Sequence, residues 1–357
     1  MQLFDTIAGM GHEQVVMCHD KSSGYRGIIA IHDTTLGPAL GGTRFWQYAT
    51  DEEALVDALR LAKGMTYKNA VAGLNLGGGK AVIIGDNRTT RREMLFRAHG
   101  RFVDTLGGRY ITAEDVGTSP ADMDYVHMET DYVAGLVARS GDPSPVTAHG
   151  VFRAIEACAH HRWGSNKLRG KSVAVQGLGH VGYYLCQELH AAGAKLVVSD
   201  IDAERVKRVV HEFHATPVDK DEVHSAPVDV YAPCALGGVI NDRTIPQLRC
   251  EVVAGAANNQ LLEPRHGDEL EQRGILYAPD YVANAGGVIN VYGELAGWDH
   301  ERAYRKAGEI YETVLGVFEI AKESGVPTYV AADRLAERRV KAVHDMMRPK
   351  PPHPRKS

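Results

Sequence analysis

A short apolar strand, followed at once by a glycine-rich turn and a helix, constrains this chain more than any other stretch. The predicted strand is KSVAVQ, residues 171–176, and the next predicted strand, KLVVSD, ends at Asp200. The turn between strand and helix consists of Gly177, Leu178, Gly179, His180, Val181 and Gly182. Since helices and strands continue to alternate beyond it, this stretch predicts a doubly wound parallel sheet.

The residue types of this turn suit a bound dinucleotide. Gly177 permits the tight turn, Gly179 lets a pyrophosphate reach the helix N-terminus, and Gly182 allows the helix to pack closely on the strand. Asp200 would accept a hydrogen bond from a ribose 2′-OH and repel a 2′-phosphate, so the motif predicts NAD in preference to NADP. A flavodoxin-like turn without a cofactor is the structural alternative.

A second distinctive stretch, residues 63–80 (KGMTYKNAVAGLNLGGGK), places Lys68 and Lys80 on either side of an uncharged segment. Its three consecutive glycines would let backbone or ligand approach closely. A lysine buried there would lose hydration, so its pKa would fall and it could act as a general base. A helix end, a turn and two solvated lysines are the structural alternative. Leu74 and Ala81 exclude a Walker A phosphate loop, which needs glycine and Ser or Thr at those positions.

The first part of the chain predicts a mixed α/β domain. Strands are expected at residues 13–19, 25–32, 80–85 and 109–113. Capping boxes at Thr50 and Thr90 would start two helices, which run to Gly64 and to about residue 106. Met65 and Lys68 would then lie just past the C-terminal end of the first helix.

Two connecting segments carry further candidates. Residues 34–44 are predicted as a loop in which Gly41 and Gly42 free the backbone. Asp115 follows the strand at 109–113 and precedes a helix start, a position that often carries chemistry. A carboxylate near two lysines could exchange protons with a substrate amine, whereas capping a turn or pairing with an arginine is the structural alternative.

The second half adds strands and helices in alternation. Strands are expected at residues 229–233, 251–255 and 275–279, and helices at 146–161, 299–324 and 331–346. In a doubly wound sheet, ligands gather at the carboxyl ends of the strands. Asn258, Asn259, Gly286 and Gly287 follow such ends and are expected to face a nicotinamide, with local turn hydrogen bonding as the alternative.

Composition excludes several function classes. A net charge of −5 gives no electrostatic case for nucleic acid or an anionic membrane, and no apolar run reaches transmembrane length. The five cysteines are widely spaced, which is typical of reduced thiols in a cytoplasmic protein. His211 and His214 lack a third ligand, so no metal site is predicted.

Seven stretches must be considered together. They are KGMTYKNAVAGLNLGGGKAVIIGD, ITAEDVGTSP, DPSPVTAHGV, VQGLGHVG, YAPCALGG, GAANNQL and APDYVANAGGVINV. In order, over nearly all of residues 10–340, they resemble the NAD-dependent glutamate, leucine, phenylalanine and valine dehydrogenase family, and most closely its leucine-specific members. The resemblance implies an α/β substrate and oligomerisation domain and a Rossmann doubly wound parallel-sheet domain, separated by a cleft.

The expected boundaries follow from the stiff DPSP segment. The first domain would span 1–140 and be completed by a helix at about 326–346, the NAD-binding domain would span 146–325, and residues 347–357 would be a disordered tail. Family members of this size are typically homo-oligomers, so an octamer or a dimer is expected.

The resemblance also implies reversible oxidative deamination of an L-amino acid to a 2-oxo acid and ammonium. Lys80 matches the lysine that activates water, and Asp115 matches the acid that exchanges protons with the amino group. The residues that match the carboxylate-binding set are Lys68, Met65, Gly41 and Gly42. The residues that match the nicotinamide and ribose contacts are Thr147, Cys234, Ala235, Ala256, Asn258 and Asn259.

Substrate choice is implied by the matching side-chain pocket. Its residues are Leu40, Ala113, Val288 and Val291. All four are aliphatic, and a pocket without a cation cannot pair the second carboxylate of glutamate, so a branched-chain amino acid such as leucine, valine or isoleucine is expected. Tyr292, Gly293 and His149 depart from the leucine pattern, which keeps phenylalanine or tryptophan as alternative substrates. A catalytically silent NAD or amino-acid sensor and an opine-type reductase are the alternatives from other classes.

Overall fold

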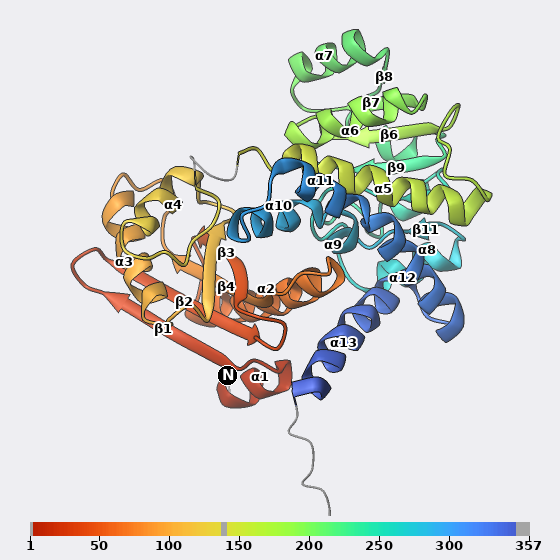
Figure 1. The fold of residues 1–357 in the computed structure, drawn as a ribbon. Coiled ribbons are helices and arrows are strands. Elements are labelled where there is room, and N and C mark those ends of the chain that lie inside the picture. Colours follow the sequence, from red (N-terminus) through yellow and green to blue (C-terminus); the bar gives the residue numbers. More distant parts are fainter. Residues whose placement is uncertain (1–2, 137–140, 348–357) are drawn as a thin grey trace, which may run out of the picture. The chain divides into compact units, whose positions relative to one another are not determined.

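The computed structural model describes residues 3–136 and 141–347, and the chain divides into two compact units (Figure 1). The first unit holds the described residues up to Val133 and those from Ala336 onward, and the second holds those from Ala134 to Leu335. Each unit has its own β-sheet, and the sheet of the second unit is parallel throughout. The predicted α/β class with a doubly wound parallel sheet is confirmed.

The sheet of the first unit has the strand order β1-β2-β4-β3-β5. The strands are β1 (Gln14–Asp20), β2 (Tyr25–Asp33), β3 (Ala39–Trp46), β4 (Gly77–Ile84) and β5 (Tyr110–Glu114). β1 pairs antiparallel with β2 and β2 with β4, whereas β3 runs parallel to both β4 and β5. β3 therefore lies between the strands that carry Lys80 and Asp115.

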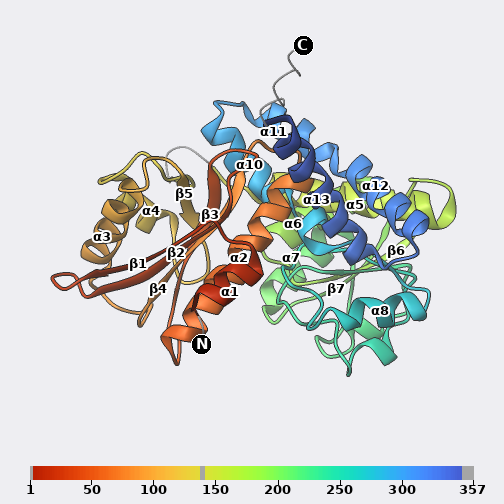
Figure 2. The ribbon, with the colours of Figure 1, turned by 90° about the horizontal axis from the view of Figure 1, so that it is seen from below.

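Helices cover both faces of this sheet (Figure 2). They are α1 (Leu3–Met10), α2 (Asp51–Val71), α3 (Arg92–Asp104) and α4 (Pro120–His127). The apolar stripe of α2, with Leu55 and Leu59, packs on Ile28 of β2. Tyr25 at the start of β2 stacks on Phe102 of α3 instead. Because strand side chains alternate between the two faces, both faces of the sheet are buried.

The prediction that the first long helix ends at Gly64 is wrong. α2 starts at its predicted cap, Thr50, but runs through Gly64 and continues to Val71. A glycine inside a helix weakens it without ending it, and Gly73, with φ of +72°, is where the chain turns away. Met65 and Lys68 consequently lie on α2 and not beyond it.

The predicted loop at residues 34–44 is also wrong at its second half, because Gly41 and Gly42 lie on β3. A Cβ on Gly41 would lie 1.7 Å from the carbonyl oxygen of Gly79, and one on Gly42 would lie 2.4 Å from that of Glu114. A Cβ on Gly78 would lie 2.1 Å from the backbone nitrogen of Thr66 on α2. These glycines therefore permit the close packing of strands and helix, which is the backbone approach that the sequence predicted, and their contact with a ligand stays a prediction.

A matched pair of substitutions tests this packing argument. Gly41→Ala should lower the free energy of unfolding by about 3 kcal/mol or more, because its Cβ has no room between the strands. Gly64→Ala should raise the same quantity by about 0.5–1 kcal/mol, since Gly64 lies inside a helix with open space around it. Chemical denaturation of both proteins measures the two values. Equal effects of the two substitutions would contradict the argument.

The sheet of the second unit has the order β11-β10-β9-β6-β7-β8. Its strands are β6 (Ser172–Gln176), β7 (Lys195–Ser199), β8 (Thr216–Pro217), β9 (Val230–Pro233), β10 (Val252–Val253) and β11 (Leu276–Tyr277). The helices up to β11 are α5 (Ser144–Trp163), α6 (His180–Ala191), α7 (Ala203–Phe213) and α8 (Arg265–Gln272). The later helices are α9 (Asp280–Ala283), α10 (Gly286–Leu295), α11 (His300–Gly308), α12 (Ile310–Ser324) and α13 (Thr328–Met347).

Three further expectations need correction. The helix predicted at 299–324 is two helices, α11 and α12, which meet at Gly308 and Glu309. The cap of α3 is Arg91, not Thr90, and no side chain caps that helix. The predicted tail lies beyond Met347, outside the described residues. Within the part of the chain that the structure describes, no helix is both long and apolar enough to cross a membrane.

Candidate active site

Lys80 and Asp115 form an ion pair that crosses β3. The Lys80 ammonium lies 3.0 Å from Oδ2 of Asp115, and Lys80 is only 5% exposed. Lys80 is on β4 and Asp115 directly follows β5, the two strands that flank β3. A Cβ on Gly42 of β3 would lie 2.8 Å from the Cβ of Asp115. The absence of a side chain at Gly42 thus leaves the space through which the pair meets.

Arg44 is the residue that the sequence analysis missed. Its Nε donates to Oδ2 of Asp115 at 3.0 Å, so one carboxylate oxygen is shared between Lys80 and Arg44. The other end of the guanidinium is held by Asp57 at 2.8 Å, and Tyr48 donates to the same Asp57 oxygen at 2.8 Å. Arg44 follows Gly42 by two residues and so shares its face of β3. Because residues 34–44 were predicted as a loop, the alternation of side chains along a strand was not applied to them, and Arg44 was not predicted as a site residue.

The charges of this cluster shift both partners of the pair. Burial lowers the pKa of Lys80 below its ordinary value, which the negative charge of Asp115 only partly offsets, and the positive charge of Arg44 lowers it further. Burial acts to raise the pKa of Asp115, but the adjacent Lys80 and Arg44 outweigh it, so this pKa is also lowered. Among the described residues, the hydrogen bond to the Asp115 side chain goes to Oδ2 and none goes to Oδ1. A lysine that is readily neutral therefore adjoins an ionised carboxylate with one available oxygen.

A buried polar network lies beside these strands. The His99 ring bonds through Nδ1 to the Tyr25 hydroxyl and through Nε2 to Thr43, each at 2.8 Å. Thr43 of β3 bonds in turn to Thr112 of β5 at 2.6 Å. Burial lowers the pKa of His99 to about 3, so the ring stays neutral. The network ties β3 to β5 next to Gly42 and Asp115.

The remaining predicted substrate residues of the first unit lie on three neighbouring elements. Leu40 is buried on β3 and Ala113 is buried on β5. Met65 packs near Gly41, because a Cβ on Gly41 would lie 3.3 Å from Cγ of Met65. Lys68 is half-buried in the last turn of α2. The structure thus brings Lys80, Asp115, Gly41, Gly42 and Met65 together. The approach of Lys68 to a substrate carboxylate stays a prediction.

Val288 and Val291 belong to α10 of the second unit, so their share in one pocket with Leu40 stays a prediction. Tyr292, next to Val291, packs edge-on against Trp298 at 5.0 Å between ring centroids. His149 stacks on Tyr304 at 3.8 Å and bonds through Nδ1 to Glu188 at 2.9 Å. Tyr292 and His149, two of the three departures from the leucine pattern, therefore have packing partners within their own unit.

The glycine turn of the second unit has the geometry of a dinucleotide cradle. Gly177 has φ of +93°, and a Cβ on Gly182 would lie 1.9 Å from the carbonyl oxygen of Gly177. A Cβ on Gly179 would meet only Arg205 Nη1, at 3.9 Å, so the outer side of the turn is open. A cavity of about 280 Å³ adjoins it, lined among others by Leu178, Gly179, His180 and Arg205. The residues present fit a phosphate-bearing cofactor at the start of α6.

Asp200 directs its carboxylate toward this turn. Its Oδ2 accepts from the backbone nitrogen of Leu178 at 2.6 Å, and its Oδ1 accepts from that of Asp202 at 2.8 Å. Each carboxylate oxygen retains a lone pair for a ribose hydroxyl. The placement matches the predicted role, which itself stays a prediction.

The other predicted cofactor residues lie near the carboxyl ends of the strands or on α5. Asn258 accepts from Asn284 at 2.9 Å, and Asn259 has φ of +52°. Cys234 follows β9, Ala235 adjoins the turn at Gly177, and Ala256 accepts a hydrogen bond from Asn284. Thr147 lies on α5, where its hydroxyl donates to Pro143 at 2.9 Å. A Cβ on Gly286 would lie 2.2 Å from the carbonyl oxygen of Val146, so this glycine permits close packing on α5, and its approach to a nicotinamide stays a prediction.

Comparison with known proteins identifies the family of this chain. The family model "Glu/Leu/Phe/Val dehydrogenase, dimerisation domain" matches residues 12–132, and "Glutamate/Leucine/Phenylalanine/Valine dehydrogenase" matches residues 140–204 and 198–347. The chain belongs to the Glu/Leu/Phe/Val dehydrogenase family.

Individual relatives cover almost the whole chain. A leucine dehydrogenase of Geobacillus stearothermophilus is 59% identical over 98% of this chain and 96% of its own length. A valine dehydrogenase of Streptomyces virginiae is 52% identical over 95% of this chain and 96% of its own length. The crystal structure of L-tryptophan dehydrogenase from Nostoc punctiforme matches with a TM-score of 0.88 at 51% identity, over 96% of this chain and 99% of that chain.

Proposed function

We propose that this protein catalyses the reversible, NAD-dependent oxidative deamination of a branched-chain L-amino acid. Amino acid, NAD⁺ and water give the 2-oxo acid, ammonium, NADH and a proton. The observation that carries the proposal is the 59% identity to a leucine dehydrogenase over nearly the full length, joined to the Lys80–Asp115 pair. Other leucine dehydrogenases, from Bacillus cereus and Bacillus subtilis, are 58% identical.

Each residue of the cluster has a task in this proposal. Lys80, whose pKa is lowered by burial, takes a proton from water as the water attacks the imino carbon of the oxidised substrate. Asp115, held ionised by Lys80 and Arg44, takes a proton from the substrate amine through Oδ1 and returns it to the leaving amine. Lys68 on α2 holds the substrate carboxylate. Bound NAD⁺ supplies a hydride acceptor, and the glycine turn and Asp200 would hold it.

The residues expected to receive the substrate side chain are all apolar, which supports an aliphatic substrate. Leu40 and Ala113 are buried apolar residues of the first unit, and Val288 and Val291 supply no charge from the second. A hydrophobic pocket distinguishes one methylene by only about 1–3 kcal/mol, so leucine, valine and isoleucine should all react. An L-tryptophan dehydrogenase at 53% identity keeps aromatic substrates as the second candidate.

A rate panel tests the proposal. NADH oxidation is followed with ammonium and each of five 2-oxo acids, the counterparts of leucine, valine, isoleucine, phenylalanine and tryptophan. The highest kcat/KM is expected with a branched-chain acid. A catalytically silent sensor would show no turnover with any of them, an opine-type reductase would require another amine in place of ammonium, and an aromatic preference would favour the second candidate.

Replacing Arg44 should shift the pH dependence of the reaction. Arg44 lowers the pKa of Lys80, so Arg44→Gln should raise that pKa. The acid limb of the kcat/KM profile, below which Lys80 is protonated and inactive as a base, should then move to higher pH. A matched control is Arg60→Gln, because Arg60 contacts Asp57 at 3.0 Å but does not touch Asp115. Identical profiles for wild type and Arg44→Gln would exclude this coupling.

Cofactor choice should depend on the charge of Asp200. Asp200→Asn retains an acceptor for the Leu178 nitrogen and removes the charge that would repel a 2′-phosphate. We expect NADH affinity to fall about tenfold and the preference for NADH over NADPH to shrink. Fluorescence titration with both cofactors measures these affinities without turnover. Asp221→Asn, an exposed carboxylate elsewhere in the unit, is the control, and an unchanged preference in Asp200→Asn would remove Asp200 from ribose recognition.

We also propose that the protein forms homo-oligomers through the first unit. β1 is an edge strand of its sheet, Met17 on it is 60% exposed, and the family domain that matches this unit is a dimerisation domain. Light scattering after size exclusion measures the mass, which separates an octamer from a dimer. A cytoplasmic location is proposed from the five cysteines, all free in the structure.

A further inference from the structure

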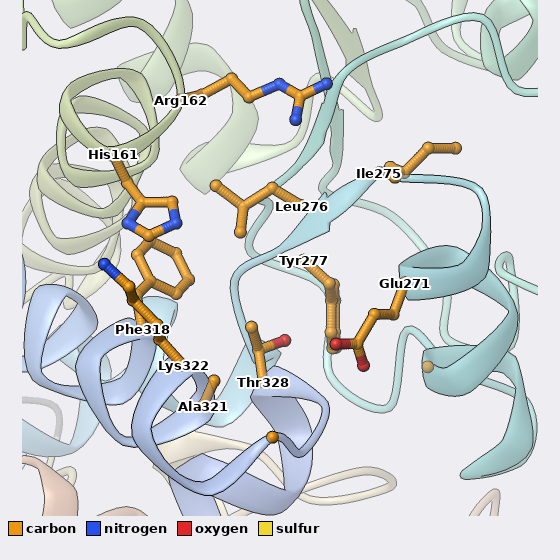
Figure 3. Close-up of a pocket in the computed structure, with 13 residues that line it drawn as sticks. His161, Arg162, Glu271, Ile275, Leu276, Tyr277, Phe318, Ala321, Lys322 and Thr328 are labelled. Carbon is orange, nitrogen blue, oxygen red and sulfur yellow. The ribbon is translucent and has the colours of Figure 1, made fainter.

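A cavity of about 440 Å³ lies in the second unit (Figure 3), and its lining includes no residue of the glycine turn. Two of its lining residues are Arg162, in the last turn of α5, the helix that precedes β6, and Leu276, the first residue of β11. These residues mark the amino ends of the strands, whereas the glycine turn follows the carboxyl end of β6. Since the two ends of parallel strands lie at opposite edges of a sheet, the cavity is separate from the cofactor cradle.

The floor of the cavity is apolar. Phe318 and Tyr277 are each less than 5% exposed, and Leu276 and Ala321 add aliphatic surface. The cavity volume falls in the usual range for small-molecule sites, which are mostly apolar with a few polar groups that fix orientation. Thr328, at the start of α13, supplies a hydroxyl group to the lining.

The side chain of one lysine, Lys322, lies on one side of this floor. Figure 3 shows His161 and Lys322 on the same side, above and beside the Phe318 ring, with Glu271 across the cavity. Among the described residues, Lys322 forms no ion pair or hydrogen bond, whereas Arg162 is paired with Glu251 at 2.8 Å.

The His161 ring lies 4.7 Å from that of Phe318. Partial burial lowers the pKa of His161, and the charges of Lys322 and Arg162 lower it further, which favours the neutral ring and leaves Lys322 as the cation beside Phe318.

We propose that this cavity binds a small organic monocarboxylate whose apolar body lies on Phe318 and Leu276 and whose carboxylate meets Lys322. An unpaired ammonium beside an apolar floor favours a ligand that is both anionic and apolar. Glu271 on the far side disfavours a second negative charge on that ligand. The proposal does not depend on which amino acid the enzyme oxidises.

Calorimetric titration of the whole protein with 3-phenylpropanoate tests this site. That probe has no amino or oxo group and so cannot turn over, and 3-phenylpropan-1-ol carries the same body without the charge. The acid should bind at least tenfold more tightly than the alcohol. Equal affinity of acid and alcohol would overturn the proposal.

Two variants separate the cavity from any other carboxylate site. Lys322→Glu should weaken binding of 3-phenylpropanoate at least tenfold. Ala321→Phe fills the apolar floor but keeps every charge, and it should also abolish binding of 3-phenylpropanoate in the cavity. Lys220→Glu makes the same charge change at an exposed position outside the cavity and should leave binding unchanged. Wild-type binding by Lys322→Glu, or an equal loss in Lys220→Glu, would reject the site.

Discussion

Replacing Lys80 by alanine is expected to lower kcat for oxidative deamination about 10³-fold. The buried ammonium is the only lysine that contacts Asp115 in the described chain, and removal of a positioned general base costs about 10²–10⁴-fold. NADH affinity should not change, because the predicted cradle lies in the other unit. Steady-state rates and fluorescence titration of NADH measure the two quantities.

The control for this experiment is Lys21→Ala. Lys21 is exposed in the turn between β1 and β2 of the same unit, so its removal should leave the rate unchanged. Thermal unfolding of both variants verifies that the fold persists. A rate close to wild type in Lys80→Ala would show that another group activates the water.

Asp115→Asn is expected to lower kcat by about 10²-fold or more, because the amide cannot take a proton from the substrate amine. The pH dependence of kcat/KM distinguishes the effect of Asp115 from that of Arg44. The carboxylate raises the pKa of Lys80, so its loss should lower that pKa and move the acid limb of kcat/KM to lower pH. Arg44→Gln should move the limb the opposite way. The two profiles together therefore report the sign of each charge at Lys80.

Glu114→Gln provides the matched control. Glu114 is the neighbouring carboxylate, is exposed at the end of β5, and has no ion pair among the described residues. Its replacement should leave kcat near wild type. If Glu114→Gln and Asp115→Asn lose activity equally, the proton exchange cannot be assigned to Asp115.

Secondary structure was predictable where the local pattern repeats. The strands at 13–19 and 25–32 correspond to β1 and β2, and the cap at Thr50 starts α2 as expected. The ends were less predictable. Gly64 does not end α2, because the tertiary contacts of the apolar stripe outweigh the cost of one exposed helical glycine, about 1 kcal/mol.

Glycine-rich segments were interpreted least well. Gly41 and Gly42 were assigned to a loop, and the three glycines before Lys80 to a close approach of backbone or ligand that the sequence could not specify further, because glycine is common in turns, strands and binding sites. The structure places all five on adjacent strands, where a Cβ would meet carbonyl oxygens, a ring or a helix backbone. Such contacts join segments far apart in sequence, so no local pattern reveals them.

The sequence by itself determined the parallel sheet, the glycine turn and the candidate pair Lys80 and Asp115, because each depends on a short run of residue types with a definite spacing. Only the tertiary structure decided that Arg44 shares a carboxylate oxygen with Lys80. That contact joins residues 71 positions apart and exists because β3 lies between β4 and β5 in register. The pKa of a buried lysine depends on which charges surround it, and those neighbours are set by strand order and not by sequence spacing.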